Sequence, residues 1–82
     1  MIKIPRKYEV NFDAQLFYLL LKKSPMSIHE ILSETGTHLN IVKSRIDRFE
    51  KLGLIILKKK DIYQLSLVHL NRDRIDEVKE FI

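Results

Sequence analysis

Residues 37–55 read THLNIVKSRIDRFEKLGLI and carry the pattern from which the fold can be predicted. Their apolar side chains recur at spacings of three, four and three, which places them on one side of a helix: Leu39, Val42, Ile46 and Phe49. Thr37 is expected to cap the first turn with its hydroxyl, and Gly53 to end the helix, because glycine tolerates positive φ. The stretch therefore predicts a helix over residues 38–52 with one buried face and one free polar face.

A second helix is predicted directly before this one. Ser27 and Glu30 have the spacing of a capping box, in which each side chain accepts a hydrogen bond from the other residue's backbone N–H. The apolar stripe of this helix would be Ile28, Ile31 and Leu32. Gly36 ends it about two turns later, since glycine permits the left-handed conformation of a tight turn. The predicted order is thus helix, short turn, helix.

The N-terminal part of the chain predicts a further helix and an arm. Residues 12–23 form a strongly apolar helix, capped by Asn11 or Asp13, that we expect to be buried in the core of its own domain. Residues 1–10 are basic and contain a proline, which predicts an extended arm with an edge strand over residues 8–10. The arm either reaches a phosphate backbone or only keeps the chain soluble.

Two β-prone runs, residues 54–57 and 62–68, predict a hairpin around the polar tip Lys58-Lys59-Lys60-Asp61. Alternation in the second run predicts a core-facing set and a water-facing set: Tyr63, Leu65 and Leu67 against Gln64 and Ser66. The last segment, residues 71–82, is predicted to be a helix capped by Asn71, with an apolar stripe of Ile75, Val78 and Ile82. It packs on the first helix or pairs with a second copy of the chain, and the sequence favours neither.

Length and composition limit the function classes. Eighty-two residues make one small domain, residues 1–82, with little room for a large catalytic cleft. The absence of cysteine excludes disulfides, thiolate zinc sites and cysteine nucleophiles. No apolar run approaches membrane-spanning length, and the N-terminus lacks the apolar core of a signal peptide. We therefore expect a soluble, cytoplasmic protein.

The net charge of +4 is unevenly distributed along the chain. Residues 37–60 carry seven lysines and arginines against two acidic residues, a net charge of +5, and residues 1–8 add +3. Residues 9–36 and residues 61–82 each carry −2. This concentration predicts that one side of the molecule faces a polyanion.

No pattern of residues indicates catalysis or a bound cofactor. The three histidines, His29, His38 and His69, lie far apart without the spacing of metal ligands. The carboxylates of the last segment have no nucleophile, partner base or glycine-rich phosphate loop beside them. We therefore expect no enzymatic activity, no cofactor and no metal.

The order of helix, helix-turn-helix and hairpin, with a basic second helix of the pair and a lysine-rich tip, resembles winged helix-turn-helix DNA-binding domains. The run IVKSRIDRFEKLGLI, residues 41–55, is similar to the recognition helix and following strand of MarR-type transcriptional regulators. Tyr63-Gln64-Leu65 is similar to the Tyr-x-Leu of their returning wing strand. The resemblance covers residues 12–68 and implies an α+β, mostly α fold with a three-helix core, a β-hairpin wing and a C-terminal helix.

The chain lacks the long flanking helices that build the dimer and the effector pocket in full-length MarR-type regulators. It resembles instead a minimal winged helix of the kind found in small archaeal, phage or plasmid regulators. No small-molecule effector is expected for such a domain.

The resemblance implies sequence-specific binding of double-stranded DNA by a transcriptional regulator, as a homodimer formed through the first or the last helix. The recognition helix, residues 38–52, would lie in the major groove, and the wing, residues 56–66, on the backbone or in the minor groove. The residues facing base edges would be His38, Asn40, Ile41, Lys43 and Ser44. The residues facing phosphates would be Thr37, Arg48, Lys58, Lys59 and Lys60.

Other roles fit some of the same residues. A protein-interaction module in a larger complex would use the exposed Ile41 and the last helix, and a binder of single-stranded nucleic acid would need more exposed aromatic residues. The lysines of the tip also suit an edge strand that must avoid aggregation. Arg45 would pair with Asp47, with Glu50 or with a neighbouring helix. The charge of +5 over residues 37–60 favours DNA over the interaction module.

Overall fold

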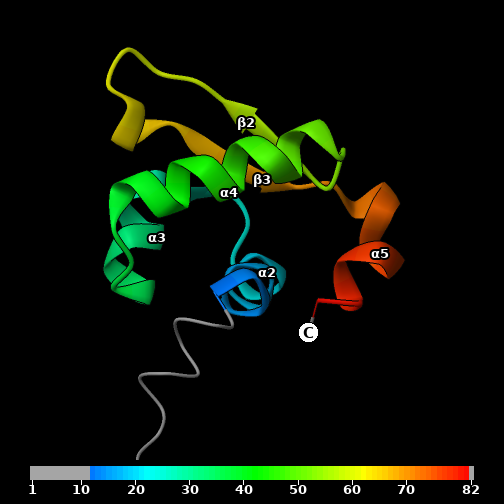
Figure 1. Cartoon of the computed structure of the whole chain (residues 1–82). Helices are drawn as coiled ribbons and strands as arrows, with labels where there is room; N and C mark the ends of the chain where they lie inside the picture. The colour runs from blue at the N-terminus through cyan, green and yellow to red at the C-terminus, as the bar shows by residue number, and fades with distance from the viewer. Residues whose placement is uncertain (1–11, 82) are drawn as a thin grey trace, which may run out of the picture.

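The computed structural model describes residues 12–81. The predicted basic arm, its edge strand over residues 8–10, the Asn11 cap and Ile82 all lie outside this part of the chain. The described elements are α2 (Phe12–Lys22), β1 (Met26–Ser27), α3 (Ile28–Thr35), α4 (Leu39–Lys51), β2 (Ile55–Lys58), the 3₁₀ turn η1 (Tyr63–Leu65), β3 (Leu67–Leu70), the 3₁₀ turn η2 (Arg72–Arg74) and α5 (Ile75–Lys79). The chain is therefore α+β and mostly helical, with a small antiparallel sheet, as the sequence predicts (Figure 1).

The predicted capping box at the start of α3 is confirmed. The Ser27 hydroxyl accepts a hydrogen bond from the Glu30 backbone N–H at 3.0 Å, and the Glu30 carboxylate accepts one from the Ser27 N–H at 3.0 Å. The helix ends where Gly36 adopts a φ of +66°, and the Gly36 N–H donates to the Leu32 carbonyl at 2.8 Å. Both ends of α3 are thus fixed by local hydrogen bonds that the sequence encodes.

α4 begins one residue later than a Thr37 cap would require, so that prediction is wrong. His38 occupies the cap position, and its side chain makes no capping hydrogen bond. Thr37 is held in the preceding turn instead, because its backbone N–H donates to the Thr35 hydroxyl at 3.3 Å. At the other end, Gly53 has a φ of +79°, which confirms that it reverses the chain after α4.

The core forms where the apolar stripe of α4 meets α2. Val42, Ile46 and Phe49 are buried as predicted, and the Phe49 ring packs against the Phe17 ring of α2 with their centroids 4.8 Å apart. Leu16 and Leu20 of α2 are also fully buried, as expected for a helix within the core of its own domain. The remaining core residues include Ile28 and Ile31 of α3 and Ile55 and Val68 of the sheet. Burial of this apolar surface is the main force that holds the helices on the sheet.

The sheet has three strands in the order β1-β3-β2. β2 and β3 form an antiparallel hairpin with Ile55 opposite Leu70 and Lys58 opposite Leu67. β1, in which Met26 lies opposite Val68, is a strand that the sequence does not predict. A strand of two residues is too short to show an alternating pattern, and only the presence of β3 beside it makes it a strand.

The returning half of the hairpin differs from the prediction. Residues 63–65 form the 3₁₀ turn η1 rather than strand, Leu65 is 54% exposed, and Ser66 is fully buried. The expected alternation is therefore wrong at Leu65 and Ser66, whereas Tyr63 is half-buried against the core and Gln64 is exposed, as predicted. The physical reason is that the buried Ser66 has hydrogen-bond partners: its hydroxyl accepts from the Lys60 N–H and its carbonyl from the Ile28 N–H, both at 3.0 Å.

The last segment packs on its own chain. The helix is shorter than predicted, because residues 72–74 form the 3₁₀ turn η2, with the Asn71 side chain accepting from the Asp73 N–H at 3.1 Å. Val78 of α5 is fully buried, and the Phe81 ring lies 5.1 Å from the Phe17 ring of α2. Of the two destinations that the sequence left open, packing on the first helix is the one observed. Over residues 12–81, no helix combines the length and the apolar character needed to cross a membrane.

Candidate functional site

The outward side of α4 is exposed along its whole length. Nine of the ten predicted site residues are exposed, and the tenth, Thr37, is half-buried in the turn before the helix. Seven of the ten lie on α4 or in the two residues before it, namely Thr37, His38, Asn40, Ile41, Lys43, Ser44 and Arg48. The structure thus brings the predicted base-reading residues together at the N-terminal half of α4.

The three remaining residues lie on the hairpin. Lys58 ends β2, and Lys59 and Lys60 begin the connection to β3. This connection lies beside the N-terminal half of α4 (Figure 1). Hydrogen bonds from the Lys60 N–H and the Ile28 N–H to Ser66 fasten this connection to the start of α3. The backbone of the tip is therefore tied at Lys60 to the buried Ser66, while the three lysine side chains are exposed.

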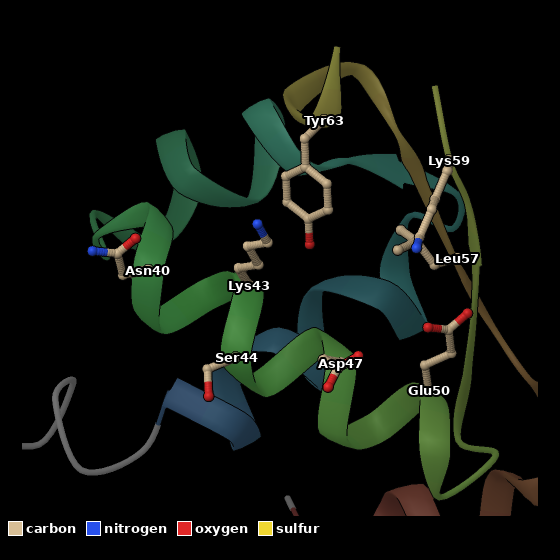
Figure 2. A pocket seen from close by; sticks show the side chains of 8 residues that line it. All are labelled: Asn40, Lys43, Ser44, Asp47, Glu50, Leu57, Lys59 and Tyr63. Carbon is tan, nitrogen blue, oxygen red and sulfur yellow. The ribbon is translucent and has the colours of Figure 1, made fainter. Parts of the chain in front are cut away.

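A groove of about 430 Å³ lies between α4 and the hairpin, and we refer to it as the α4–hairpin groove. Figure 2 shows its lining: Asn40, Lys43, Ser44, Asp47 and Glu50 come from α4, and Leu57, Lys59 and Tyr63 come from the hairpin. Lys43 points towards the Tyr63 ring, and Lys59 reaches in from the opposite side (Figure 2). The groove joins predicted site residues of α4 and of the hairpin in one cavity.

Four lining residues were not among the predicted site residues: Asp47, Glu50, Leu57 and Tyr63. The positions of Asp47 and Glu50 were predictable from the sequence, because they recur with Lys43 at helical spacing and so share one flank of the helix. Tyr63 packs against the core as the sequence predicts, but its contact with α4 was not predictable, because the sequence predicts a strand at this position. The turn η1 instead directs Tyr63 towards α4.

Charge and burial act together on Tyr63. The Lys43 ammonium nitrogen lies 5.3 Å from the centroid of the Tyr63 ring, within the range of a cation–π contact. Partial burial raises the pKa of the Tyr63 hydroxyl, and the nearby carboxylates of Asp47 and Glu50 raise this pKa further. The hydroxyl therefore stays protonated at neutral pH and remains a hydrogen-bond donor within the groove.

Ion pairs divide the basic residues into two groups. Arg45 pairs with Asp13 of α2, with its Nε donating to the carboxylate at 2.9 Å, and this hydrogen bond raises the Arg45 pKa. Of the three pairings that the sequence left open for Arg45, the one with a neighbouring helix is observed. The other ion pairs of the described chain are Lys23–Glu30, Lys51–Asp47 and Arg74–Glu77. Within residues 12–81, no ion pair involves Lys43, Arg48 or any of the three lysines of the hairpin tip.

The edge of the sheet leaves one alternative open. β2 is an outer strand, because the strand order is β1-β3-β2, and Lys58 ends it. Lysine at such a position also protects an edge strand against aggregation. That role applies to Lys58 but not to Lys59, which lies after the strand and lines the groove.

Side chains able to hold a metal ion do not gather in the described part of the chain, where no group of three or more His, Cys, Asp or Glu residues has a suitable arrangement.

Comparison with protein-family models, with curated proteins and with solved structures found no match to this chain.

Proposed function

We propose that this chain is a minimal winged helix domain that binds double-stranded DNA in a sequence-specific manner and acts as a transcriptional regulator. α4 would lie in the major groove, which is wide enough to admit a helix and presents a distinct pattern of donors and acceptors for each base pair. The β2–β3 hairpin, as the wing, would contact the backbone or the minor groove.

The observation that carries the proposal is the set of unpaired basic side chains on α4 and the hairpin. Lys43, Arg48 and the three lysines of the tip are exposed and take part in no ion pair with the described residues, whereas Arg45 on the same helix is paired. Unpaired cations on adjoining elements attract an external polyanion, and duplex DNA carries a regular array of phosphates.

The residues of this surface divide by chemistry. Asn40 offers an amide that can pair with adenine, Lys43 a donor for guanine, and Ile41 an apolar contact for a thymine methyl group. Arg48 and Lys59 suit phosphates, because their charges need no base-specific geometry. Base-reading groups in the first half of the helix and phosphate-binding groups around them are what sequence-specific recognition requires.

A salt series of binding titrations tests the proposal. The chain should bind random duplex DNA with an affinity that falls steeply as salt rises, because bound cations release counterions from the phosphates. Arg48→Ala and Lys59→Ala, which remove the groups assigned to phosphates, should each weaken binding, and each should reduce the slope of log affinity against log salt by about one. Fluorescence anisotropy with a labelled duplex measures both quantities.

Lys79→Ala provides the matched control, since it removes the same charge from an exposed position on α5. It should leave both the affinity and the slope close to those of the unmodified protein. Absence of binding at low salt, or an affinity that does not depend on salt, would contradict the proposal.

A protein-interaction module is the second candidate, and two exposed apolar side chains, one on the other flank of α4 and one just after its end, favour it. Ile41 is 47% exposed and Leu52 is 49% exposed. The last helix, expected to contribute to such a surface, already buries Val78 within the chain. Two results together would favour this candidate. The unmodified protein would show no affinity for duplex DNA, and Ile41→Ser would abolish binding of a protein partner.

A further inference from the structure

Asp47 lies on an exposed ridge of α4. Asn40, Ser44, Asp47 and Lys51 follow one another at spacings of four, three and four, so they form one line along the helix, opposite the buried stripe of Val42, Ile46 and Phe49. We call this line the outer ridge. Asp47 is its one acidic member, and its carboxylate also lines the α4–hairpin groove (Figure 2).

The Asp47 carboxylate contributes little to the fold. Its partner is Lys51 at 3.3 Å, and the two side chains are 60% and 76% exposed, so solvent screens the pair. Asp13 contrasts with it, because Asp13 is only 19% exposed and fastens α2 to α4 through Arg45. An exposed carboxylate on a DNA-binding face also repels phosphates, so a protein that bound DNA only by charge would bind better without it.

The surroundings of Asp47 suit the edge of a base better than a phosphate. Lys43 and Lys59 balance the charges of Asp47 and Glu50, so the lining of the groove is formally neutral. The groove also presents the Asn40 amide and the Tyr63 hydroxyl, which add polar groups without charge. A neutral, open groove lined by several donors and acceptors matches the mixed pattern of a base pair in the major groove.

We propose that Asp47 determines specificity by accepting a hydrogen bond from the amino group of a cytosine in the major groove. The inference rests on the proposed function. Cytosine presents an amino donor on this edge, whereas guanine and thymine present acceptors that a carboxylate repels. Adenine also has an amino group, but its N7 acceptor lies beside it and opposes the second carboxylate oxygen.

Selection of binding sites from a randomised duplex library tests the role of Asp47. The unmodified protein should enrich sites that share a cytosine at one position. In Asp47→Asn the preference for cytosine at that position should fall about tenfold. Adenine should be enriched there instead, because an amide pairs with the N6 and N7 of adenine. Asp47→Ala should lose the same preference without gaining another. Preferences at the remaining positions should not change.

Asp61→Asn is the control, because it removes the same charge from an exposed position of the hairpin tip that does not line the groove. It should select the motif of the unmodified protein. An identical motif for the unmodified protein and for both Asp47 variants would overturn the role of Asp47 while leaving DNA binding intact. Failure of the unmodified protein to bind any duplex at low salt would overturn the proposed function, and this inference with it.

Discussion

Glu30 makes two different contacts with its two carboxylate oxygens. One accepts from the Ser27 N–H at 3.0 Å and completes the capping box, and the other accepts from the Lys23 ammonium at 2.7 Å. The first contact joins residues three apart and is readable in the sequence, whereas the second spans the turn between α2 and α3. The Glu30 side chain therefore both caps α3 and links the start of α3 to the end of α2.

Ser27→Ala should lower the free energy of unfolding by about 1 kcal/mol, because the Glu30 N–H loses its acceptor at the helix start. Urea denaturation followed by circular dichroism measures the change. Ser33→Ala, at an exposed position on the same helix, should change stability by much less. Equal losses in the two variants would show that the cap contributes nothing of its own.

Glu30 should also make stability depend on pH. Hydrogen bonds from Lys23 and from the Ser27 backbone lower the Glu30 pKa below its ordinary value of 4.5. Folding thus favours the deprotonated form, so this contribution is present above about pH 4.5 and is lost as the pH falls through the lowered pKa. Urea denaturation on both sides of that pH should show a smaller loss in Glu30→Gln than in the unmodified protein. Glu77, whose pKa Arg74 lowers, adds a dependence of the same sign that the variant retains.

The connection between β2 and β3 is the element on which the geometry of the candidate site depends most. Ser66 is fully buried, and its hydroxyl and carbonyl accept hydrogen bonds from Lys60 and from Ile28. The turn η1 is closed by the Leu65 N–H donating to the Ile62 carbonyl and the Ser66 N–H donating to the Tyr63 carbonyl, both at 2.9 Å, and Tyr63 lies within cation–π distance of Lys43. The groove thus depends on a serine that carries no charge and does not line it.

Ser66→Ala should lower stability by about 1 to 3 kcal/mol, because the Lys60 N–H would be left without its acceptor in a partly buried place. It should also weaken DNA binding without changing the charge of the protein, since Lys59 and Tyr63 would no longer be held beside α4. Thermal denaturation and anisotropy titration measure the two effects. Gln64→Ala, at the exposed neighbouring position, serves as the control. Unchanged binding by Ser66→Ala would mean that the connection does not position the site.

At the scale of the whole molecule, three phenylalanine rings join the two ends of the described chain. Phe17 of α2, Phe49 of α4 and Phe81 after α5 have ring centroids 4.8 to 5.4 Å apart. Phe81 is 36% exposed, so it closes the core from its edge. The C-terminal segment thus completes the core on the side away from the hairpin (Figure 1).

Phe81→Ala should lower the free energy of unfolding by about 1 to 2 kcal/mol, because two aromatic contacts are lost together with part of the apolar burial. Urea denaturation should show an earlier midpoint. Tyr18→Ala is the comparison, since Tyr18 is an aromatic residue of α2 that is 52% exposed. If Tyr18→Ala cost as much as Phe81→Ala, the ring cluster would not be what holds the C-terminal segment.

The local elements were predictable because their signals lie within a few residues of one another. Periodicity located α2, α3 and α4, the capping box located the start of α3, and Gly36 and Gly53 marked the turns at which backbone φ is positive. The charge of residues 37–60 likewise indicated which helix carries the basic face. These features depend on backbone sterics and helix geometry, which act over a single turn.

The features that only the tertiary structure decided involve residues far apart in the chain. Arg45 and Arg48 are the same residue type on one helix, yet Arg45 pairs with Asp13 and Arg48 stays exposed, because only Arg45 lies on the side that meets α2. β1 exists because β3 lies beside it, and the buried Ser66 has its partners in Lys60 and Ile28. The physical reason is that burial and hydrogen bonding depend on which surfaces meet, and local periodicity does not specify this.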